Sequence, residues 1–526
     1  AQKNVPVRQS FTMTGTVNPD GSIGPVGGIV LKFEGAVQGG KTILGYPLSQ
    51  RIQEDPRTGH KVDLVKRFQR KGIKVVEIRD VYDAYHHMTG QMIRRQKPLS
   101  AARMIPHKTV AAALKRLAKD WLTRTEELLK TWKELPLPKA AAKRRGQLVA
   151  QISQANRAAT ALLNRGRSAG GFLQAAATHG FAQANLVKDQ VMSYIDREQY
   201  DRGLRVFNRL ARRVKRALTV TVAKFQRASP GTVSELLTLV DAYEALVNAY
   251  GAYGEAVESH REASTALEGI RDQLRRGATK PSSKLIARIQ KTITKPLSTL
   301  ANAEVRLLLA QHNLSFRGKT QRQIRFASTD LERLQKFLSG ASRALLHYFQ
   351  TTTVAPYWRS HAVPLSPSGG CRLPTPAVFP DSRYLHARNL GDYTESAVEL
   401  LSGEQKLNRT IMRMAGGFSR YMDAASLSTI HYSLKMFRKG AITRPKRQEA
   451  FDAMLKMAER KAREHAAGAV AATGEIPVPA QVAYRIARVY DRSPAPYYRM
   501  YALENFWRSS MFSQLAVAFS QRRTKK

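Results

Sequence analysis

Hydrophobic residues recur at helical spacing through most of the chain. The most regular stretch lies within residues 202–227, where one polar residue, Thr221, interrupts an apolar seam with steps of three and four. Such spacing places the seam on one side of an α-helix that packs against other protein. The seam consists of Leu204, Phe207, Ala211, Val214, Leu218 and Phe225. Comparable patterns predict helices over about 108–135, 139–165, 172–198, 282–313 and 324–348, and over about 394–422, 424–439, 445–472, 481–489 and 498–521.

The longest predicted helix covers about residues 233–276, which corresponds to roughly 60 Å at 1.5 Å per residue. A short turn at Ser229, Pro230 and Gly231 separates it from the helix at 202–227. We therefore expect the two helices to form an antiparallel hairpin. The acidic residues of the longer helix are expected on its outer face, away from the seam; they are Asp241, Glu244, Glu255, Glu258 and Glu262.

Residues 1–100 have a different pattern. Glycine is frequent, residues 11–17 alternate in polarity, and the sequence from Asn18 to Gly21 predicts a turn. Further strands are predicted at 29–33 and 73–78. Two interpretations remain open, a small β-containing unit and an extended glycine-rich arm. We do not expect a parallel sheet, because no series of alternating strands and helices is apparent.

Prolines interrupt the helical pattern between about residues 351 and 392. Long stretches without periodicity usually bind a partner or link domains. The predicted fold is therefore mainly α, a helical bundle with long helical hairpins. Its expected parts are an N-terminal arm or small β-unit (1–100), a basic helical domain with the long hairpin (101–350), a proline-rich linker or extension (351–392) and a C-terminal helical domain with a basic tail (393–526).

The charge of the chain narrows its possible partners. Lysine and arginine number 86 against 40 acidic residues, which gives a net charge of +46. A compact protein with this excess would repel itself unless a polyanion neutralised it. Candidate polyanions are RNA, DNA, an anionic membrane surface and an acidic protein lattice. A single cysteine, Cys371, excludes a disulfide or a cysteine-based zinc site within the chain. No apolar run approaches about 18 residues, so no transmembrane helix is expected.

The helix at 202–227 combines its apolar seam with a second stripe of arginines, roughly on the opposite side. No acidic residue occurs between Asp201 and Glu235. Arginine binds phosphate in a bidentate manner, so this stripe is predicted to contact RNA phosphates. Basic clusters elsewhere are assigned the same role. The predicted RNA-binding residues are Lys66, Arg67, Arg70, Lys71, Lys143, Arg144, Arg145, Arg202, Arg205, Arg209, Arg212, Arg213, Lys215, Arg216, Lys224, Arg227, Lys446, Arg447, Arg522 and Arg523.

Catalytic and metal motifs are weak. Residues 35–42 match the phosphate-binding pattern G-x-x-x-x-G-K-[ST], with Lys41 and Thr42 in the key positions. Gly45 and Pro47 fall where the required helix should begin, so an incidental match is favoured. The adjacent pair His86 and His87 cannot share one helix face, which argues against a zinc site. We expect neither a cofactor, a metal nor an enzymatic activity, and no small-molecule substrate.

Aromatic residues allow two interpretations in two places. Tyr243, Tyr250 and Tyr253 lie at seam spacing, which favours packing over stacking on bases. Tyr497 and Tyr498, beside Arg499, could stack on single-stranded bases, although anchoring of the last helix is slightly favoured.

Together these features predict a structural, rRNA-binding component of a large ribonucleoprotein, with an accessory protein of a mitochondrial ribosome as the specific hypothesis. The chain begins at Ala1 without a methionine, which fits a precursor whose targeting peptide has been removed. A location in the mitochondrial matrix is inferred from that hypothesis. The alternatives are a protein bound to an acidic lattice such as microtubules, a DNA- or nucleoid-packaging protein, and a P-loop nucleotide-binding protein.

Overall fold

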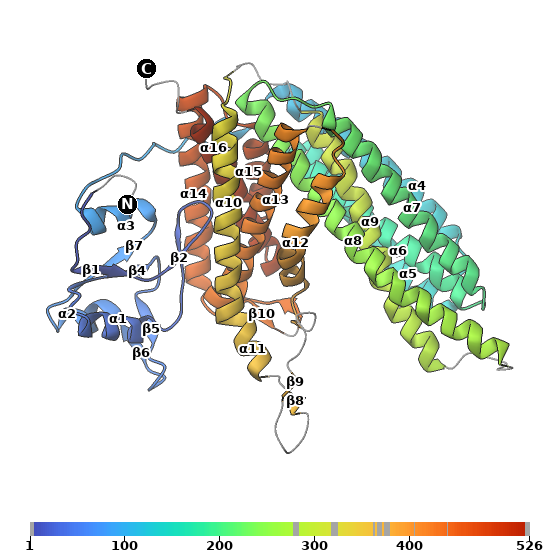
Figure 1. The fold of residues 1–526 in the computed structure, drawn as a ribbon, viewed down its shortest axis with the longest axis horizontal. Coiled ribbons are helices and arrows are strands. Elements are labelled where there is room, and N and C mark those ends of the chain that lie inside the picture. Colours follow the sequence, from blue (N-terminus) through green and yellow to red (C-terminus); the bar gives the residue numbers. More distant parts are fainter. Residues whose placement is uncertain are drawn as a thin grey trace. The chain divides into compact units, whose positions relative to one another are not determined.

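The computed structural model describes residues 5–276, 283–316, 324–360, 363–364, 371–372, 379–403, 405–438 and 440–520. The protein is mostly helical with a small N-terminal strand unit, which confirms the predicted fold class (Figure 1). It divides into two compact units. Unit 1 comprises Ala1–Ile105, Phe337–Arg388 and Phe418–Lys526, and unit 2 comprises Pro106–Lys336 and Asn389–Gly417. The units are assembled from separate stretches of chain, whereas the four parts expected from the sequence are consecutive.

The N-terminal part of unit 1 contains a parallel three-stranded sheet, which the sequence did not lead us to expect. Its strand order is β1 (Phe11–Met13), β4 (Ile43–Pro47) and β7 (Lys74–Ile78). Helices α1 (Ile29–Gln38) and α2 (Leu64–Gln69) lie in the two connections, and α3 (Val81–Thr89) follows β7. A short hairpin follows each of the first two sheet strands in the sequence. After β1 comes β2 (Thr16–Val17) paired with β3 (Ile23–Gly24), and after β4 comes β5 (Ile52–Glu54) paired with β6 (Lys61–Asp63).

Helices cover both faces of this sheet. On one face Leu44 and Tyr46 pack with Phe33 of α1 and Phe68 of α2. On the other face Phe11 and Ile78 pack with Ala84 of α3. Figure 1 shows α1 and α2 on one side of the sheet and α3 on the other. The N-terminal region is therefore a small α/β layer structure and not an extended arm.

The strand predicted at residues 29–33 was wrong, because these residues open helix α1. Ile29, Val30 and Phe33 are all buried, and their spacing of one and four is that of a helix face. Gly28 precedes the helix with φ of 65°, a backbone conformation that favours glycine. A short apolar run is compatible with either a strand or a helix, and here the burial of one helical face decides.

The rest of unit 1 is helical. Helix α16 (Pro496–Ser520), predicted at about 498–521, packs against α14 (Gln448–Thr473) and α15 (Val478–Tyr490), and it buries Phe506, Trp507 and Phe512. Shorter elements are η1 (Ala101–Met104), the π-helices η2 (Gln350–Val354) and η4 (Ser428–Ser433), α11 (Ala355–Ser360), and two strand pairs, β8 (Val363–Pro364) with β9 (Cys371–Arg372) and β10 (Phe437–Arg438) with β11 (Ala441–Ile442).

The helices predicted at 394–422 and 424–439 have different boundaries in the structure. They are α12 (Ser382–Glu399) and α13 (Lys406–Leu427), followed by η4 and the β10–β11 pair. Gly403, with φ of 69°, lies in the break between the two helices. The boundary predicted at about residue 423 lies inside α13, because no glycine or proline interrupts the helix between Asp423 and its end.

Unit 2 is a bundle of long helices. They are α4 (Lys108–Glu134), α5 (Lys139–Asn164), α6 (Ser168–Ile195), α7 (Tyr200–Gln226), α8 (Val233–Arg275) and α9 (Ser283–Leu314), with the beginning of α10 (Ser328–Phe349) and parts of α12 and α13. The predicted contact between α7 and α8 forms: the rings of Phe225 and Tyr243 meet edge to face with centroids 5.0 Å apart. Helix α8 also packs extensively along α9 (Figure 1).

The expectation that the acidic residues of α8 all face outward was wrong for Glu244, which is only 6% exposed. Neighbouring helices surround this part of α8. At Gly251 a Cβ atom would lie 2.6 Å from the ring of Tyr393 in α12, so the two helices touch closely there. Tyr243 is fully buried, and burial raises the pKa of its hydroxyl. The tyrosine at the centre of the seam therefore packs within the protein.

Two histidines lie inside the bundle of unit 2 against Trp121 of α4. The ring centroids of His179 and His312 lie 4.8 Å and 5.8 Å from that of Trp121. Burial and, to a smaller extent, the nearby Arg124 together lower the pKa of each histidine to about 4. The two imidazoles are therefore neutral in the folded protein at pH 7.

We expect unit 2 to lose stability as the pH falls from 7 to 5. Unfolded histidine has a pKa near 6.5, so the unfolded state binds protons in this range before the folded state does. The neutral histidines therefore stabilise unit 2 fully at pH values above 6.5, and this contribution is lost as the pH falls toward 4. At pH 5 the loss should reach about 2 kcal/mol per histidine. Hydrogen exchange of unit 2 peptides across a urea series measures it. A double variant with His179→Gln and His312→Gln should show a much smaller difference in unfolding free energy between pH 7 and pH 5. An unchanged difference would contradict the conclusion that these two histidines cause the loss of stability.

Candidate functional site

The basic stripe of α7 forms an exposed surface, which we call the α7 basic face. All the arginine and lysine side chains of α7 that were predicted to bind RNA are exposed to solvent. On the opposite side Phe207, Val214 and Phe225 are buried, at 2%, 0% and 0% exposure. The helix therefore separates cations from core as the sequence predicted. The α7 basic face consists of Arg202, Arg205, Arg209, Arg212, Arg213, Arg216, Lys224 and Arg227, with Lys215 at its margin.

The polar residue in the seam of α7 has a structural explanation. Thr221 is fully buried, and its hydroxyl donates to the carbonyl oxygen of Ala217 at 2.7 Å. The hydroxyl oxygen of Thr221 in turn accepts a hydrogen bond from the side-chain amide of Gln311 in α9 at 2.8 Å. A buried hydroxyl with both bonds formed is tolerated in a core. The interruption therefore joins α7 to α9 and does not weaken the separation of the two faces.

Only part of the α7 basic face is engaged within the protein. Arg213 forms an ion pair with Glu304 at 2.7 Å, and Lys224 donates to Gln311 at 3.1 Å. Arg202 and Arg212 bond to groups on or beside their own helix. Among the described residues, Arg209 and Arg216 have no ion-pair partner within 4 Å. An uncompensated row of exposed guanidinium groups raises the local positive potential, which attracts polyanions.

Several other predicted RNA-binding residues hold the fold together. Arg67 pairs with Glu34 and with Asp55 at 2.5 Å and 3.0 Å. Arg144 pairs with the buried Asp189, and Arg145 donates to the carbonyl oxygens at the end of α4.

Arg447 donates to the carbonyl oxygen of Val26 at 2.5 Å, and burial lowers the pKa of its guanidinium. Among the remaining predicted cations, Lys66, Arg70, Lys71, Lys143 and Lys446 are exposed, and Arg522 and Arg523 lie outside the described residues.

The segment that matches the P-loop pattern does not have P-loop geometry. A P-loop runs from a strand into a helix, whereas residues 35–42 leave helix α1 and enter strand β4. The Nζ atom of Lys41 donates to the carbonyl oxygen of Gln9 at 2.6 Å. The lysine that would bind phosphate therefore joins this turn to the residues before β1.

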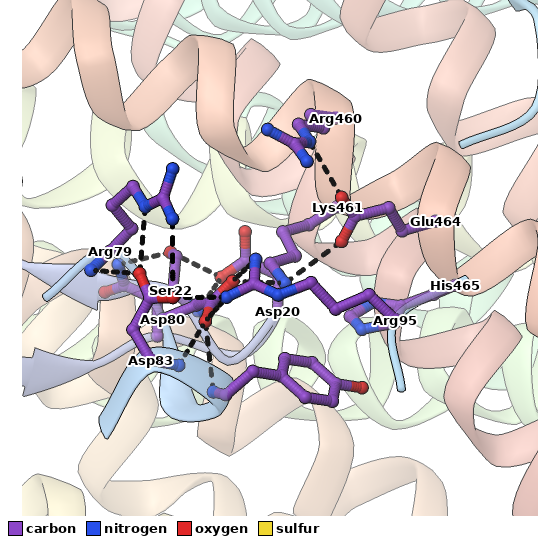
Figure 2. A network of polar contacts seen from close by, with 12 residues as sticks. Asp20, Ser22, Arg79, Asp80, Asp83, Arg95, Arg460, Lys461, Glu464 and His465 are labelled. Carbon is purple, nitrogen blue, oxygen red and sulfur yellow. Dashed lines mark hydrogen bonds and ion pairs between the residues drawn. The ribbon is translucent and has the colours of Figure 1, made fainter. Parts of the chain in front are cut away.

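Unit 1 contains a buried network of charged residues that sequence analysis missed (Figure 2). At its centre is Asp80, which is fully buried and precedes α3. One carboxylate oxygen accepts the backbone N–H groups of Tyr82 and Asp83, both at 3.0 Å, and so caps the helix. Arg95 contacts both carboxylate oxygens, at 2.9 Å and 3.0 Å.

Lys461 of α14 completes this network from the other side. Its side chain is 1% exposed, and Nζ lies 2.6 Å from Asp80 and 3.0 Å from Glu464. It also lies 4.6 Å from the centre of the Tyr82 ring, a cation–π distance. Because Asp80 belongs to the α/β part and Lys461 to α14, the network joins these two parts of unit 1. We define the Asp80 network as Asp20, Asp80, Asp83, Arg95, Lys461 and Glu464.

A sequence signal for this network existed. Lys461 lies within a stripe of buried alanines in α14, at a position where an apolar residue would be usual. A lysine on a buried helix face needs a carboxylate partner. Which carboxylate supplies it depends on the tertiary fold. Asp20 of the same network is 1% exposed. Burial raises the pKa of its carboxyl, and this effect exceeds that of the hydrogen bonds from Ser22, which lower the pKa.

The tyrosines near the start of α16 are partly on the surface. Tyr497 and Tyr498 are 58% and 43% exposed. Tyr498 stacks on Tyr490 of α15 with centroids 5.2 Å apart, and Tyr497 meets Tyr498 edge to face. The stack between α15 and α16 agrees with a role in anchoring the last helix.

The described residues contain no group of three or more His, Cys, Asp or Glu side chains that could hold a metal ion. In the same part of the chain, no helix has the length and apolarity needed to cross a membrane. The α7 basic face is the candidate site with the clearest chemistry, a row of exposed arginine and lysine side chains on one face of a helix. No protein-family model, curated protein or solved structure matches this chain.

Proposed function

We propose that the protein is a structural, RNA-binding component of a large ribonucleoprotein, with unit 2 bound to RNA phosphates. The observation that supports this most directly is the α7 basic face. Its arginines are exposed while the apolar residues of the same helix are buried, and no acidic residue of α7 follows Asp201. The narrower form of the proposal is an accessory protein of a mitochondrial ribosome.

The proposed mechanism is electrostatic docking. Residues three or four positions apart rise about 5–6 Å along a helix, so Arg205, Arg209, Arg212 and Arg216 present guanidinium groups in a row. A row at this spacing can contact several phosphates of one RNA strand or across a groove. Such contacts fix position and orientation but do not identify bases. The buried seam of α7 holds the helix in place, so the ordering on binding is confined to the arginine side chains.

We expect the native protein to sediment with RNA. In a gradient of cell extract at low salt it should migrate in a large particle, and treatment with RNase should move it to the top of the gradient. High salt should also release it, because counterion release makes phosphate binding steeply dependent on salt. Detection of the protein and of RNA across the fractions is the measurement.

Other outcomes identify the competing functions. Sedimentation that persists after RNase treatment but is lost when microtubules are depolymerised would support binding to an acidic lattice. Loss with DNase alone would support DNA packaging. Migration as a free monomer at physiological salt in untreated extract would contradict both of these functions and the proposed function as well.

A further inference from the structure

A pocket of about 540 Å³ lies in unit 1 against the Asp80 network. It is lined by residues of helices α14 and α16, by Tyr82 of α3 and by the chain segment after α3. Arg95, Glu464 and His465 of Figure 2 line it. Its volume is within the range of pockets that hold small organic molecules. The network fixes the wall, because Arg95 and Glu464 are both held in ion pairs.

The floor of the pocket is apolar and made of small side chains. It consists of Gly468, Ala471, Ala472, Val517 and Ala518. Gly468 lies in the interior of α14, where glycine costs about 0.5–1 kcal/mol relative to alanine. A Cβ atom there would meet its nearest neighbour, Val517, at 3.6 Å, an ordinary contact. Packing within the protein therefore does not require glycine at this position.

His465 of α14 supplies a hydrogen-bond donor to the pocket. Burial lowers the pKa of His465 to about 3, so its imidazole is neutral. The side-chain amide nitrogen of Gln514 lies 3.3 Å from Nδ1 of this ring. An amide nitrogen can only donate, so Nδ1 accepts and the ring proton is on Nε2. Nε2 has no hydrogen-bond partner among the described residues.

The lining of the pocket also contains a cation without an ion pair within the described part of the chain. Arg94 lines the same pocket, is exposed, and has no ion pair with any residue that the structure describes. The one carboxylate in the lining, Glu464, already contacts Arg460 at 2.7 Å and Lys461 at 3.0 Å. The lining therefore offers a ligand a guanidinium, an imidazole N–H and an apolar floor, beside the polar side chains of Tyr82, Gln96 and Gln514.

We propose that this pocket binds a small carboxylic acid with a flat apolar body, its carboxylate on Arg94 and Nε2–H of His465 and its body on the floor at Gly468. The carboxylate is the acceptor that matches both donors, since charged hydrogen bonds of this kind are the strong ones. The flat body fits a floor made of Gly468 and alanines, with Val517 as its branched side chain. This binding does not depend on RNA, so it stands or fails separately from the proposed function.

Titration calorimetry on the full chain tests the proposal with 2-naphthoate as the probe. 2-Naphthamide is the neutral counterpart, and acetate is the counterpart without an apolar body. Gly468→Leu fills the floor, and Gly146→Leu is its control. Like Gly468, Gly146 lies inside a helix, and an added Cβ at Gly146 has no neighbour within 4 Å. Arg94→Gln removes the cation, and Arg103→Gln is its control on another exposed arginine of unit 1.

The expected result is saturable binding of one 2-naphthoate per chain, weakened about tenfold or more by Gly468→Leu and by Arg94→Gln and unchanged by the two controls. The amide and acetate should each bind at least about tenfold more weakly. Absence of saturable binding, equal binding of acid and amide, or insensitivity to both pocket variants would overturn the proposal. Circular dichroism checks the fold of Gly468→Leu; if that variant does not fold, Arg94→Gln decides.

Discussion

Replacing Asp80 by alanine should destabilise unit 1 by about 3–5 kcal/mol, the usual cost of breaking a buried ion pair. The change leaves Lys461 buried with one carboxylate partner in place of two, and it leaves Arg95 paired with Asp83 alone. It also removes the N-cap of α3. Hydrogen exchange of peptides from β4 and α14 across a urea series measures the effect in unit 1 alone. A probe of the whole chain would mix the two units, whose unfolding need not be a single transition.

Asp63 provides a matched control for this experiment. It caps α2 through the N–H of Lys66, and it pairs with Arg51 at 3.0 Å, so it resembles Asp80 in both roles. Its pair is at the surface, with Arg51 half exposed. Asp63→Ala should therefore cost only about 1 kcal/mol, mainly through the lost cap. If Asp80→Ala cost no more than Asp63→Ala, the Asp80 network would not be the buried clamp that its geometry implies.

A double variant separates the cost of leaving Lys461 buried without Asp80 from the other costs of removing Asp80. Asp80→Ala with Lys461→Met removes the stranded buried cation and replaces it with an apolar side chain of similar length. Replacing a whole buried pair is far less harmful than removing one partner, so the double variant should recover part of the lost stability. A double variant that is less stable than Asp80→Ala by the full cost of a second, independent mutation would contradict this coupling.

Helical seams made most of unit 2 and the last helices of unit 1 predictable. The seam of α7 and the length of α8 follow directly from spacing, because a helix that packs on one side repeats its apolar residues every three or four positions. The parallel sheet was not predictable in the same way. Its strands are short, and in residues 29–33 an apolar run that fits a strand equally well is part of helix α1.

The charged residues show where sequence analysis stops. Arg209 and Arg67 look alike in the sequence, each in a basic cluster, yet Arg209 is exposed whereas Arg67 pairs with Glu34 and Asp55. Those partners come from other elements and meet Arg67 only in the folded chain. The same is true of Asp80 and Lys461, which lie far apart in sequence. Spacing can show that a cation lies on a helix face, but its partner is determined by tertiary structure.

Neutralising the α7 basic face should weaken RNA binding by about a hundredfold or more at low salt, because each lost phosphate contact also loses the release of a counterion. The variant replaces Arg202, Arg205, Arg209, Arg212 and Arg216 by glutamine. All five side chains are exposed, so the fold of unit 2 should not change. The control removes the same number of exposed cations from another helix of unit 2, by glutamine at Lys108, Lys115, Lys119, Lys130 and Lys133 of α4. It should reduce binding much less, since the loss of net charge is the same but the α7 basic face stays intact.

The salt dependence of that binding tests the central claim most directly. Affinity for a structured RNA is measured over a series of salt concentrations for the unmodified protein, the α7 variant and the α4 control. If the five arginines contact phosphates, the slope of log K against log salt should become shallower by about 3.5–4.5 in the α7 variant and stay nearly unchanged in the control. Equal slopes for the unmodified protein and the α7 variant would contradict the claim that this face binds RNA.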